Sequence, residues 1–434
     1  MQAGVRNAAG IPELRRRIFF TLAMLAVYRA GVQVPTPGVN REALGLFFDE
    51  LGGMFDMFNL FAGGALEGFS IFALGIMPYI SATIIFQLLT VVVPYLDALK
   101  KEGEAGRQKI TQYTRYSTIG LALVQGMFIS VGLEGMSAPG GVPLVIDPGW
   151  GFRLMTMLTL TCGTAFIMWL GEQITERGIG NGISLIIFAG IVASMPSALA
   201  STFRMVGTGE LALIAIPLLL VMVLGVTGFI VFVETSQRRI PVQYAKRMVG
   251  RQMYGGQQSH LPLKINMAGV IPAIFASSIM MFPETIGNFV QVDWIQRASA
   301  AMAWGSLPHT IIFVIFLVFF CFFYVAITFN PTDVSDNLKR NGGFIPGVRP
   351  GKKTADFLDR VATRLTVVGA LYISAICVLP TVLISEFNVP FYFGGTALLI
   401  VVVVAIDTIG QIESHTMMRN YDGFLKSGRF KGRR

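Results

Sequence analysis

The sequence predicts an all-α polytopic membrane protein with ten transmembrane helices in two halves. Of its 434 residues, 53% are hydrophobic and 14% are charged, whereas about 25% of the residues in a soluble domain are charged. Apolar runs recur along the whole chain, and each is long enough to cross a bilayer as a helix, which takes about 20 residues. Lysine and arginine concentrate in alternate loops, as expected of a polytopic protein.

The ten predicted spans cover residues 18–34, 71–93, 117–134, 152–171, 183–203, 211–233, 267–290, 308–329, 366–385 and 394–412. The first span follows three arginines, 15–17, but ends without a small-x-small cleavage pattern, so we expect it to be retained. Of the 34 Lys and Arg residues, 29 fall on one side of the predicted spans, four on the other, and Arg29 lies within span one. This asymmetry predicts that both termini are cytoplasmic.

Five spans in each half mean that the second half enters the membrane in the opposite direction. If the halves are repeats, they are inverted repeats. The stretches GIMPYISAT (75–83) in span two and GVIPAIFAS (269–277) in span seven share Gly, Pro, Ile and Ala at the same offsets. A nine-residue match can arise by chance, but spans two and seven are the positions that a five-plus-five repeat makes equivalent.

Ionisable residues within membrane spans usually mark an ion pathway or a proton relay. Here Arg29, Glu172, Glu234 and Asp407 all lie near span ends, and no predicted span has a carboxylate near its centre. We interpret these four residues as interfacial anchors or members of local pairs. A coupled ion or proton transporter is therefore disfavoured.

The sequence offers no site for enzyme chemistry. The stretch GVRPGKKT (347–354) is not a phosphate loop, because its glycines are too close together and Lys353 stands where Ser or Thr would bind magnesium. The histidines and cysteines lack metal-ligand spacing; they are His260, His309, His415, Cys162, Cys321 and Cys377. We expect no enzymatic activity, no cofactor and no metal, so a partner must supply any energy.

The connection between spans one and two, residues 35–70, is long and contains the apolar stretch FNLFAGGALEGF (58–69). This stretch has about half the length needed to cross a bilayer. It is either an interfacial helix or a re-entrant segment, and the second alternative implies a cavity open to the outside.

Two cytoplasmic loops, 235–266 and 330–365, are long and basic. Strand-like residues in 238–249 and the turn pair Gly255-Gly256 predict a hairpin in the first loop. Topology needs only a few basic residues near each span end, so this excess suggests a surface for an acidic protein or for RNA, as in a ribosome. The candidate docking residues are Arg238, Arg239, Lys246, Arg247, Arg251, Lys339, Arg340, Arg349, Lys352 and Lys353. A secondary transporter for a small apolar solute is the alternative class, but it has no use for such loops.

Two long stretches resemble the signatures of the SecY family: GIMPYISATIIFQLL (75–89) and MWLGEQITERGIGNGISLIIFAGI (168–191). NMAGVIPAIFASS (266–278), NPTDVSDNLKRNGGFIPGVRPG (330–351) and VPFYFGGTALLIVVVV (389–404) are also similar to the family. The resemblance covers essentially the whole chain. It implies a protein-conducting channel in the bacterial cytoplasmic (inner) membrane, formed by two inverted five-helix halves around a central hourglass pore.

The resemblance also implies how the channel works and with which partners. Unfolded secretory polypeptides pass through a plugged pore, and signal sequences and transmembrane segments leave sideways through a lateral gate into the lipid bilayer. The implied partners are the small membrane subunits SecE and SecG, the SecA motor ATPase, the ribosome with its RNA and proteins, signal sequences and nascent polypeptides. The implied domains are a cytoplasmic segment (1–17), an N-terminal half (18–203), a C-terminal half (204–412) and a basic cytoplasmic tail (413–434).

Residue by residue, the resemblance implies three sets of working residues. The pore ring consists of Ile76, Ile80, Ile183, Ile187, Ile274 and a sixth residue, either Val404 or Ala405. The plug covers about residues 60–69: Leu60, Phe61, Ala62, Gly63, Gly64, Ala65, Leu66 and Glu67 with the two residues that follow. The lateral gate includes Pro78, Ser81, Thr83, Gln87, Pro272, Ser277 and Ser278. We expect the two prolines to permit bending, and the polar side chains to bond across the closed gate.

Overall fold

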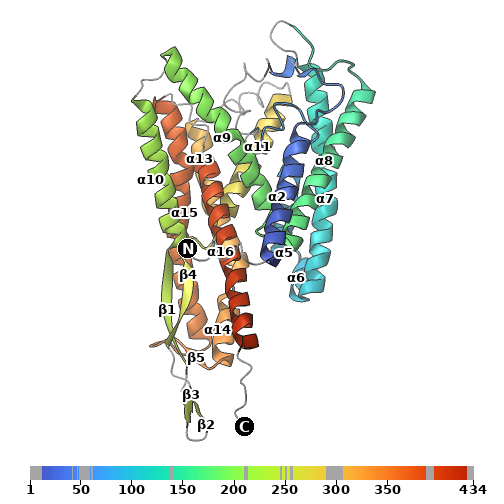
Figure 1. Cartoon of the computed structure of the whole chain (residues 1–434). Helices are drawn as coiled ribbons and strands as arrows, with labels where there is room; N and C mark the ends of the chain where they lie inside the picture. Colours follow the sequence, from blue (N-terminus) through green and yellow to red (C-terminus); the bar gives the residue numbers. More distant parts are fainter. Residues whose placement is uncertain are drawn as a thin grey trace. The chain divides into compact units, whose positions relative to one another are not determined.

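The computed structural model describes residues 12–41, 43–45, 47, 59, 62–136, 141–209, 214–244, 247–249, 252–254, 258–289, 306–387 and 395–427. Each of the ten predicted spans overlaps a helix (Figure 1). These helices are α2 (Pro12–Val32), α5 (Met77–Val92), α7 (Glu104–Gly135), α8 (Trp150–Arg177), α9 (Gly182–Thr208), α10 (Ala215–Thr235), α11 (Ile271–Phe289), α13 (Leu307–Thr328), α15 (Lys352–Phe387) and α16 (Gly395–Ser427).

Among the described residues, six helices are long and apolar enough to cross a membrane, and a bent pair of helices could make a seventh span. This agrees with the predicted polytopic helical class, while the count of ten spans stays a prediction. The bent pair is α5 followed by α6 (Pro94–Lys101), with an angle of 97° between them. Pro94 begins α6, where its missing N–H costs nothing.

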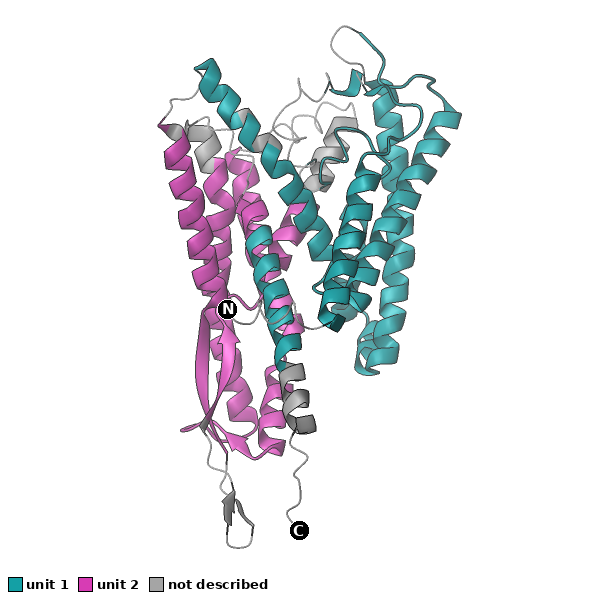
Figure 2. Ribbon diagram, in the orientation of Figure 1, with its two compact units in different colours: residues 1–210, 284–300, 400–434 teal, residues 211–283, 301–399 magenta. Residues whose placement is uncertain are grey.

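The chain divides into two compact units, which Figure 2 shows in different colours. Unit 1 comprises residues 1–210, 284–300 and 400–434. In this unit α7 packs along α8, and α2 packs against α8 and α9. One cluster of its core joins Leu44, Phe69, Leu144 and Leu160, so the connections that follow α2 and α7 are packed into the helix bundle.

Unit 2 comprises residues 211–283 and 301–399. Its α13 packs on α15, and its loops form a three-stranded antiparallel sheet in the order β4-β1-β5. The strands are β1 (Gln237–Tyr244), β4 (Gln258–Lys264) and β5 (Gly343–Phe344). The short strands β2 (Arg247–Val249) and β3 (Gln252–Tyr254) pair with each other. The predicted hairpin in the first basic loop is therefore confirmed, but its predicted turn is not. The pairing of Val249 with Gln252 places the chain reversal between these residues and not at Gly255-Gly256.

The sheet, α14 (Pro331–Arg340) and the first turns of α15 share a small apolar core. Its buried members are Ile240, Leu263, Ile345, Leu358, Val361 and Leu365. This core makes the two basic loops of unit 2 a folded structure, and it keeps their exposed side chains on a fixed backbone.

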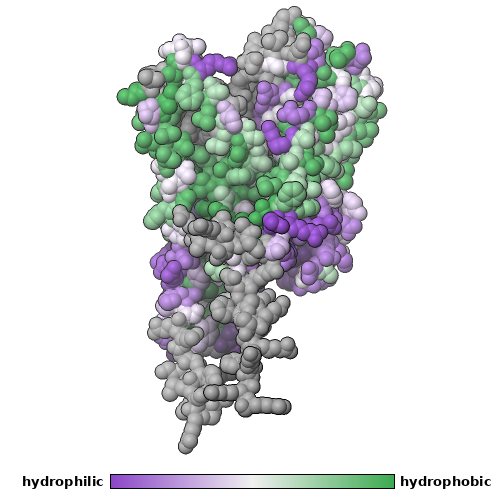
Figure 3. Space-filling model, in the orientation of Figure 1, coloured by the Kyte–Doolittle hydropathy of each residue, from purple (hydrophilic) through white to green (hydrophobic). Residues whose placement is uncertain are grey.

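The outer faces of the spanning helices are apolar, as lipid contact requires. On α10, Leu218, Leu224 and Phe232 are 67%, 63% and 70% exposed. Figure 3 shows hydrophobic residues over the visible face of α10 and hydrophilic residues over the β1–β4 hairpin. This distribution marks α10 as membrane-embedded and the hairpin as a structure outside the bilayer.

Candidate functional site

The segment between α2 and α5 is a run of turns rather than a helix. Residues 62–75 contain no described helix, so the interfacial-helix alternative does not describe them. Left-handed backbone occurs at Gly63 (φ 67°), Gly64 (φ 84°) and Gly75 (φ 56°), and also at Phe69 (φ 38°). Glycine adopts this conformation without a steric penalty, which explains the glycine-rich sequence.

Side chains of α2 hold this segment by its main-chain carbonyls. The hydroxyl of Tyr28 donates to the carbonyl of Ala62 at 3.2 Å, and the guanidinium of Arg29 donates to the carbonyl of Gly63. Gly63 also packs closely against Gly190 of α9. A Cβ added at Gly63 would lie only 2.8 Å from the Gly190 Cα. The predicted plug thus lies inside unit 1, against α2 and α9.

Internal hydrogen bonds also hold the segment together. The amide of Asn59 donates to the carboxylate of Glu67 at 3.0 Å, and the Glu67 N–H donates back to the Asn59 side chain at 3.2 Å. The N–H of Gly64 donates to the Asn59 carbonyl at 2.8 Å. Leu60 and Phe61, which we predicted as the first plug residues, lie outside the described residues.

Arg29 is a functional candidate that the sequence indicated only as an interfacial anchor or a member of a local pair. Its structural partner is a backbone carbonyl, and no sequence pattern reveals such a partner. The available signal was an arginine within a span, facing a loop rich in glycines. An ionisable residue in a membrane span is a functional hypothesis by default.

The predicted ring residues of unit 1 form two pairs spaced four residues apart. Ile76 and Ile80 are buried at the start of α5, and Ile187 is buried on α9. Ile183 is half-buried, with its Cγ1 3.1 Å from where a Cβ on Gly171 would lie. Residues four apart share one helix face, so each pair presents aliphatic groups on one side of its helix.

The remaining ring candidates lie on α11 and α16. Ile274 of unit 2 is half-buried, as is Ala405, while Val404 is 8% exposed. Both alternatives for the sixth position remain open. The predicted ring takes residues from both units, so the ring as a whole stays a prediction.

The starts of α5 and α11 have the same local geometry. Gly75 and Gly269 both have positive φ, 56° and 63°. Five residues after each glycine, the N–H of Ile80 or Ile274 donates to the carbonyl of the residue four positions earlier, at 3.1 and 3.3 Å. The two stretches of the nine-residue sequence match thus also share their backbone conformation at the helix start. This agreement supports the interpretation of the two halves as repeats.

This geometry corrects the expected role of the gate prolines. Span two was predicted from residue 71, which would place Pro78 within the span, but α5 begins at Met77. Similarly, α11 begins at Ile271, directly before Pro272. Proline in the first helical turn removes no helix hydrogen bond, so both prolines start a helix and neither bends one.

The gate hydroxyls also differ from expectation. Thr83 donates to the carbonyl of Tyr79, Ser277 to that of Ala273, and Ser278 to that of Ile274, each at 2.8 Å. These donors bond within their own helix, as Ser and Thr often do. Each hydroxyl oxygen can still accept a hydrogen bond, so the expected bonding across the gate stays a prediction. Ser81 is buried and Gln87 is half-buried.

The second signature stretch forms a tightly packed joint between α8 and α9. Asn181 caps α9 by accepting from the N–H groups of Ile183 and Ser184. A Cβ at Gly182 would lie 1.9 Å from the Gly171 carbonyl oxygen, which explains why glycine is required there. The N–H of Gly180 donates to the side chain of Gln411 on α16 at 2.9 Å.

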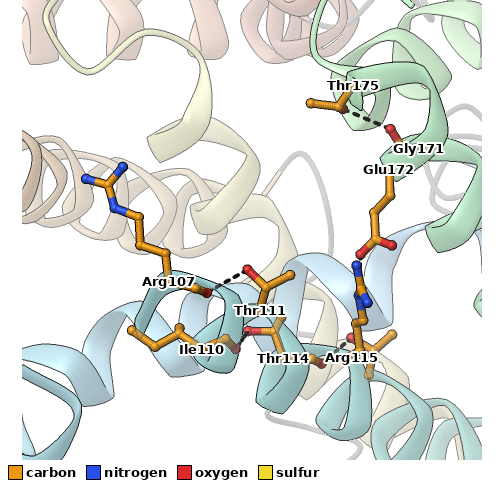
Figure 4. A network of polar contacts seen from close by, with 9 residues as sticks. Arg107, Ile110, Thr111, Thr114, Arg115, Gly171, Glu172 and Thr175 are labelled. Carbon is orange, nitrogen blue, oxygen red and sulfur yellow. Dashed lines mark hydrogen bonds and ion pairs between the residues drawn. The ribbon is translucent and has the colours of Figure 1, made fainter. Parts of the chain in front are cut away.

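Two of the four ionisable residues near span ends form local contacts of the expected kind. Glu172 pairs with Arg115 at 2.7 Å, and Figure 4 shows this ion pair beside the bond from Thr175 to Gly171. Glu234 accepts from the amide of Asn266 at 2.7 Å. The interpretation of Glu172 as a member of a local pair is confirmed.

The second basic loop presents Arg349 on a fixed backbone. The hydroxyl of Thr354 donates to the carbonyl of Arg349 at 2.9 Å, and Ser335 donates to the carbonyl of Gly351 at 2.8 Å. Gly347 and Gly351 have φ of 81° and 96°. The Arg349 side chain itself is exposed.

Seven predicted docking residues are exposed and form no ion pair with any described residue: Arg238, Arg239, Lys339, Arg340, Arg349, Lys352 and Lys353. Lys246 and Arg251 lie outside the described residues, and Arg247 is described only as backbone of β2. Unpaired arginines and lysines on a folded support are available for an anionic partner.

Within the described residues, no three His, Cys, Asp or Glu side chains form a group that could hold a metal ion. The arrangement is therefore built from apolar helices, a pinned turn segment and an exposed basic surface. Together these features define a polytopic helical membrane protein of the channel or transporter class.

Comparison with known proteins identifies the family. The model of the SecY family matches residues 70–409. The protein translocase subunit SecY of Escherichia coli (strain K12) is 52% identical over 428 residues, which cover 98% of this chain and 96% of the relative. The chain belongs to the SecY family.

Solved structures share the fold. A structure described as that of a protein-conducting channel has a TM-score of 0.69 at 17% identity, and the match covers 96% of this chain and 95% of that chain. Sec61 in the canine ribosome-channel complex from the endoplasmic reticulum has a TM-score of 0.66 at 16% identity, covering 96% and 95%. These matches confirm the predicted fold class.

Proposed function

We propose that the chain forms a protein-conducting channel, which passes unfolded secretory polypeptides across the cytoplasmic membrane and releases signal sequences and transmembrane segments into lipid. The observation that carries this proposal is the turn segment 62–75, held between α2 and α9. Non-helical backbone at membrane depth is tolerated only inside protein or beside a water-filled cavity. Such a segment suits a plug. Because the chain belongs to the SecY family, we take the cavity that the plug fills as the path of the translocated polypeptide.

The resting channel closes by packing. The plug occupies the outer side of the pore, and the aliphatic ring from Ile76, Ile80, Ile183, Ile187, Ile274 and Val404 or Ala405 excludes water at the waist. Hydrophobic constrictions of this kind gate by dewetting. The ring residues contribute shape and apolar surface, and no chemistry is required of them.

The lateral gate opens between the helices that begin at Met77 and Ile271. The matching left-handed glycines, Gly75 and Gly269, end the irregular backbone and start each helix at a defined residue. We propose that α5 and α11 move as rigid rods about these starts, since neither proline interrupts a helix. A signal sequence entering between them replaces helix contacts with its own apolar surface.

Partners supply the energy and dock on the basic loops of unit 2. Exposed Arg349 on its pinned loop suits a carboxylate or phosphate, because arginine makes planar contacts with several donors. The docking partners are the SecA motor and the ribosome; Sec61 in the canine complex is a structure with a ribosome bound to a channel of this fold. SecE and SecG complete the membrane complex, and both termini of the chain are cytoplasmic.

The alternative class, a transporter for small solutes, fits the structure less well. The folded basic loops carry seven cations that form no ion pair within the described part of the chain, and they would serve no purpose in such a transporter. A channel moved by partners needs no catalytic site of its own.

The test is reconstitution into liposomes with the two small subunits and the motor ATPase. ATP should produce a preprotein fragment protected from added protease, and omission of ATP should abolish it. A complex that assembles and stimulates the ATPase but never protects preprotein would contradict the proposal.

A further inference from the structure

The outer end of α2 contacts the plug through two adjacent side chains. Tyr28 is 2% exposed, and its ring stacks on Phe72 with centroids 5.9 Å apart. Phe72 in turn stacks on Phe166 of α8 at 6.0 Å. This stacking fixes the Tyr28 hydroxyl in position toward the Ala62 carbonyl.

Arg29 places a positive charge on the next carbonyl, that of Gly63. A charge-assisted hydrogen bond is roughly twice as strong as a neutral one. Both bonds reach main-chain atoms, so they do not depend on the plug's side chains. They depend on the path of the backbone at residues 62 and 63.

That path is set by a close contact between two glycines. A Cβ added at Gly63 would lie 2.8 Å from the Gly190 Cα, and one added at Gly190 would lie 3.0 Å from the Gly63 Cα. The first distance is shorter than side-chain carbon contacts allow, and the second is tighter than most of them, so a larger residue at either position would push the segment and α9 apart. The carbonyls of Ala62 and Gly63 would then move away from Tyr28 and Arg29.

We propose that Tyr28 and Arg29 form a latch that holds the plug closed by its backbone, with the Gly63–Gly190 contact as its seat. This inference rests on the proposed function, because it takes residues 62–69 as the plug. The two side chains are positioning residues that set how readily the plug leaves. When it leaves, Arg29 loses its carbonyl partner and must be hydrated, so release requires water in the outer cavity.

The test measures the plug position directly and without transport. Leu66→Cys, in a background in which exposed Cys162 is replaced by Ala, is labelled from outside with an impermeant maleimide in the reconstituted complex. Arg29→Met should raise the labelling rate about tenfold, and Tyr28→Phe about fivefold, in line with the loss of a charged and a neutral bond. Arg29→Lys should restore most of the protection.

Controls on α9 separate the latch from general loosening. Arg204→Met removes an exposed arginine and should not change labelling. Gly190→Ala should raise labelling, whereas Gly207→Ala, with nothing within 4 Å of an added Cβ, should not. Unchanged labelling in Arg29→Met and Gly190→Ala, with the complex intact, would overturn the latch.

Resting ion conductance in planar bilayers distinguishes failure of the latch from failure of the proposed function. If Arg29→Met raises both labelling and conductance, the latch and the plug assignment both stand. Raised labelling without raised conductance would keep the latch but contradict the role of the segment as a seal.

Discussion

The plug segment of unit 1 and the tip loop of unit 2, residues 341–351, are built in the same way but have different roles. Each turns on glycines of positive φ, and each is held by side-chain donors that bond its main-chain carbonyls. The donors are a hydroxyl and a guanidinium for the plug, and two hydroxyls for the tip loop. The plug is buried among helices, with Ala65 completely inaccessible. The tip loop instead exposes Arg349 beyond a small core.

The difference lies in where the supporting groups come from. The plug's carbonyls bond to α2, which is far from the plug in sequence. The tip loop's carbonyls bond to Ser335 and Thr354, on the two helices that flank it. The plug can therefore leave its site while α2 remains folded, whereas the tip loop cannot move without its own helices. Which groups bond the loop carbonyls therefore decides whether a loop is a releasable seal or a rigid docking point.

The largest effect is expected at the rigid loop. Arg349→Glu should abolish ATP-driven import of a preprotein into proteoliposomes, because it reverses the charge that meets the partner. Arg349→Lys should also be clearly impaired, since lysine cannot copy the planar contacts of arginine. Import should be measured at two salt concentrations.

Lys352 and Lys353 provide the matched comparison. Reversing either charge should mainly alter encounter rate and salt sensitivity, as expected of rim charges. If Arg349→Glu imports as well as the parent at both salt concentrations, the loop only determines topology.

The next effect concerns the releasable seal. Deletion of residues 61–67 should leave import working, raise resting ion conductance and relax the need for a strong signal sequence, because the segment blocks by packing alone. The measurements are import of preproteins with strong and weak signals, and conductance in planar bilayers. Loss of import from a folded, assembled complex would mean that the segment is structural.

A smaller rise in conductance is expected from the pore ring. Replacing Ile187 or Ile274 by Asn puts a polar group into an apolar constriction and should admit water. Ile187→Leu keeps the volume and polarity and should remain closed. Unchanged conductance of both Asn variants, at normal expression, would remove these residues from the ring.

The smallest effect tests how the tip loop is held. Thr354→Val removes the bond to the Arg349 carbonyl at nearly constant volume and should slow import by roughly twofold to fivefold, as the loss of about 1 kcal/mol allows. Thr363→Val is the control, because its exposed hydroxyl bonds only within α15, to the Asp359 carbonyl. Equal import by the two variants would show that the loop does not need this support.

The sequence predicted the helices well because the positions of membrane spans depend mainly on local composition, namely apolar runs and the charges in the loops between them. It also indicated the hairpin, since paired strand patterns are local features. The apolar stretch 58–69 is too short to span a bilayer, but its role as the plug came from the family resemblance and stays a prediction. Hydropathy could not place the first residue of α5: residues 71–76 are as apolar as the helix, and only the left-handed Gly75 marks its start.

The finer contacts of the site could not be predicted from sequence. The hydroxyls of Thr83, Ser277 and Ser278 had two possible acceptors, and those within the helix compete successfully. The partner of Arg29 is a carbonyl 34 residues away along the chain, and any residue type could supply it. Such contacts depend on the folded path of the backbone.

The central claim is that sealing and docking reside in separate loops. The most direct test measures resting conductance and ATP-driven import on the same preparations of two variants, the 61–67 deletion and Arg349→Glu. The two variants should behave in opposite ways: the deletion variant should conduct ions at rest and still import, and Arg349→Glu should stay closed but fail to import. If both variants lose import and neither leaks, the separation is contradicted.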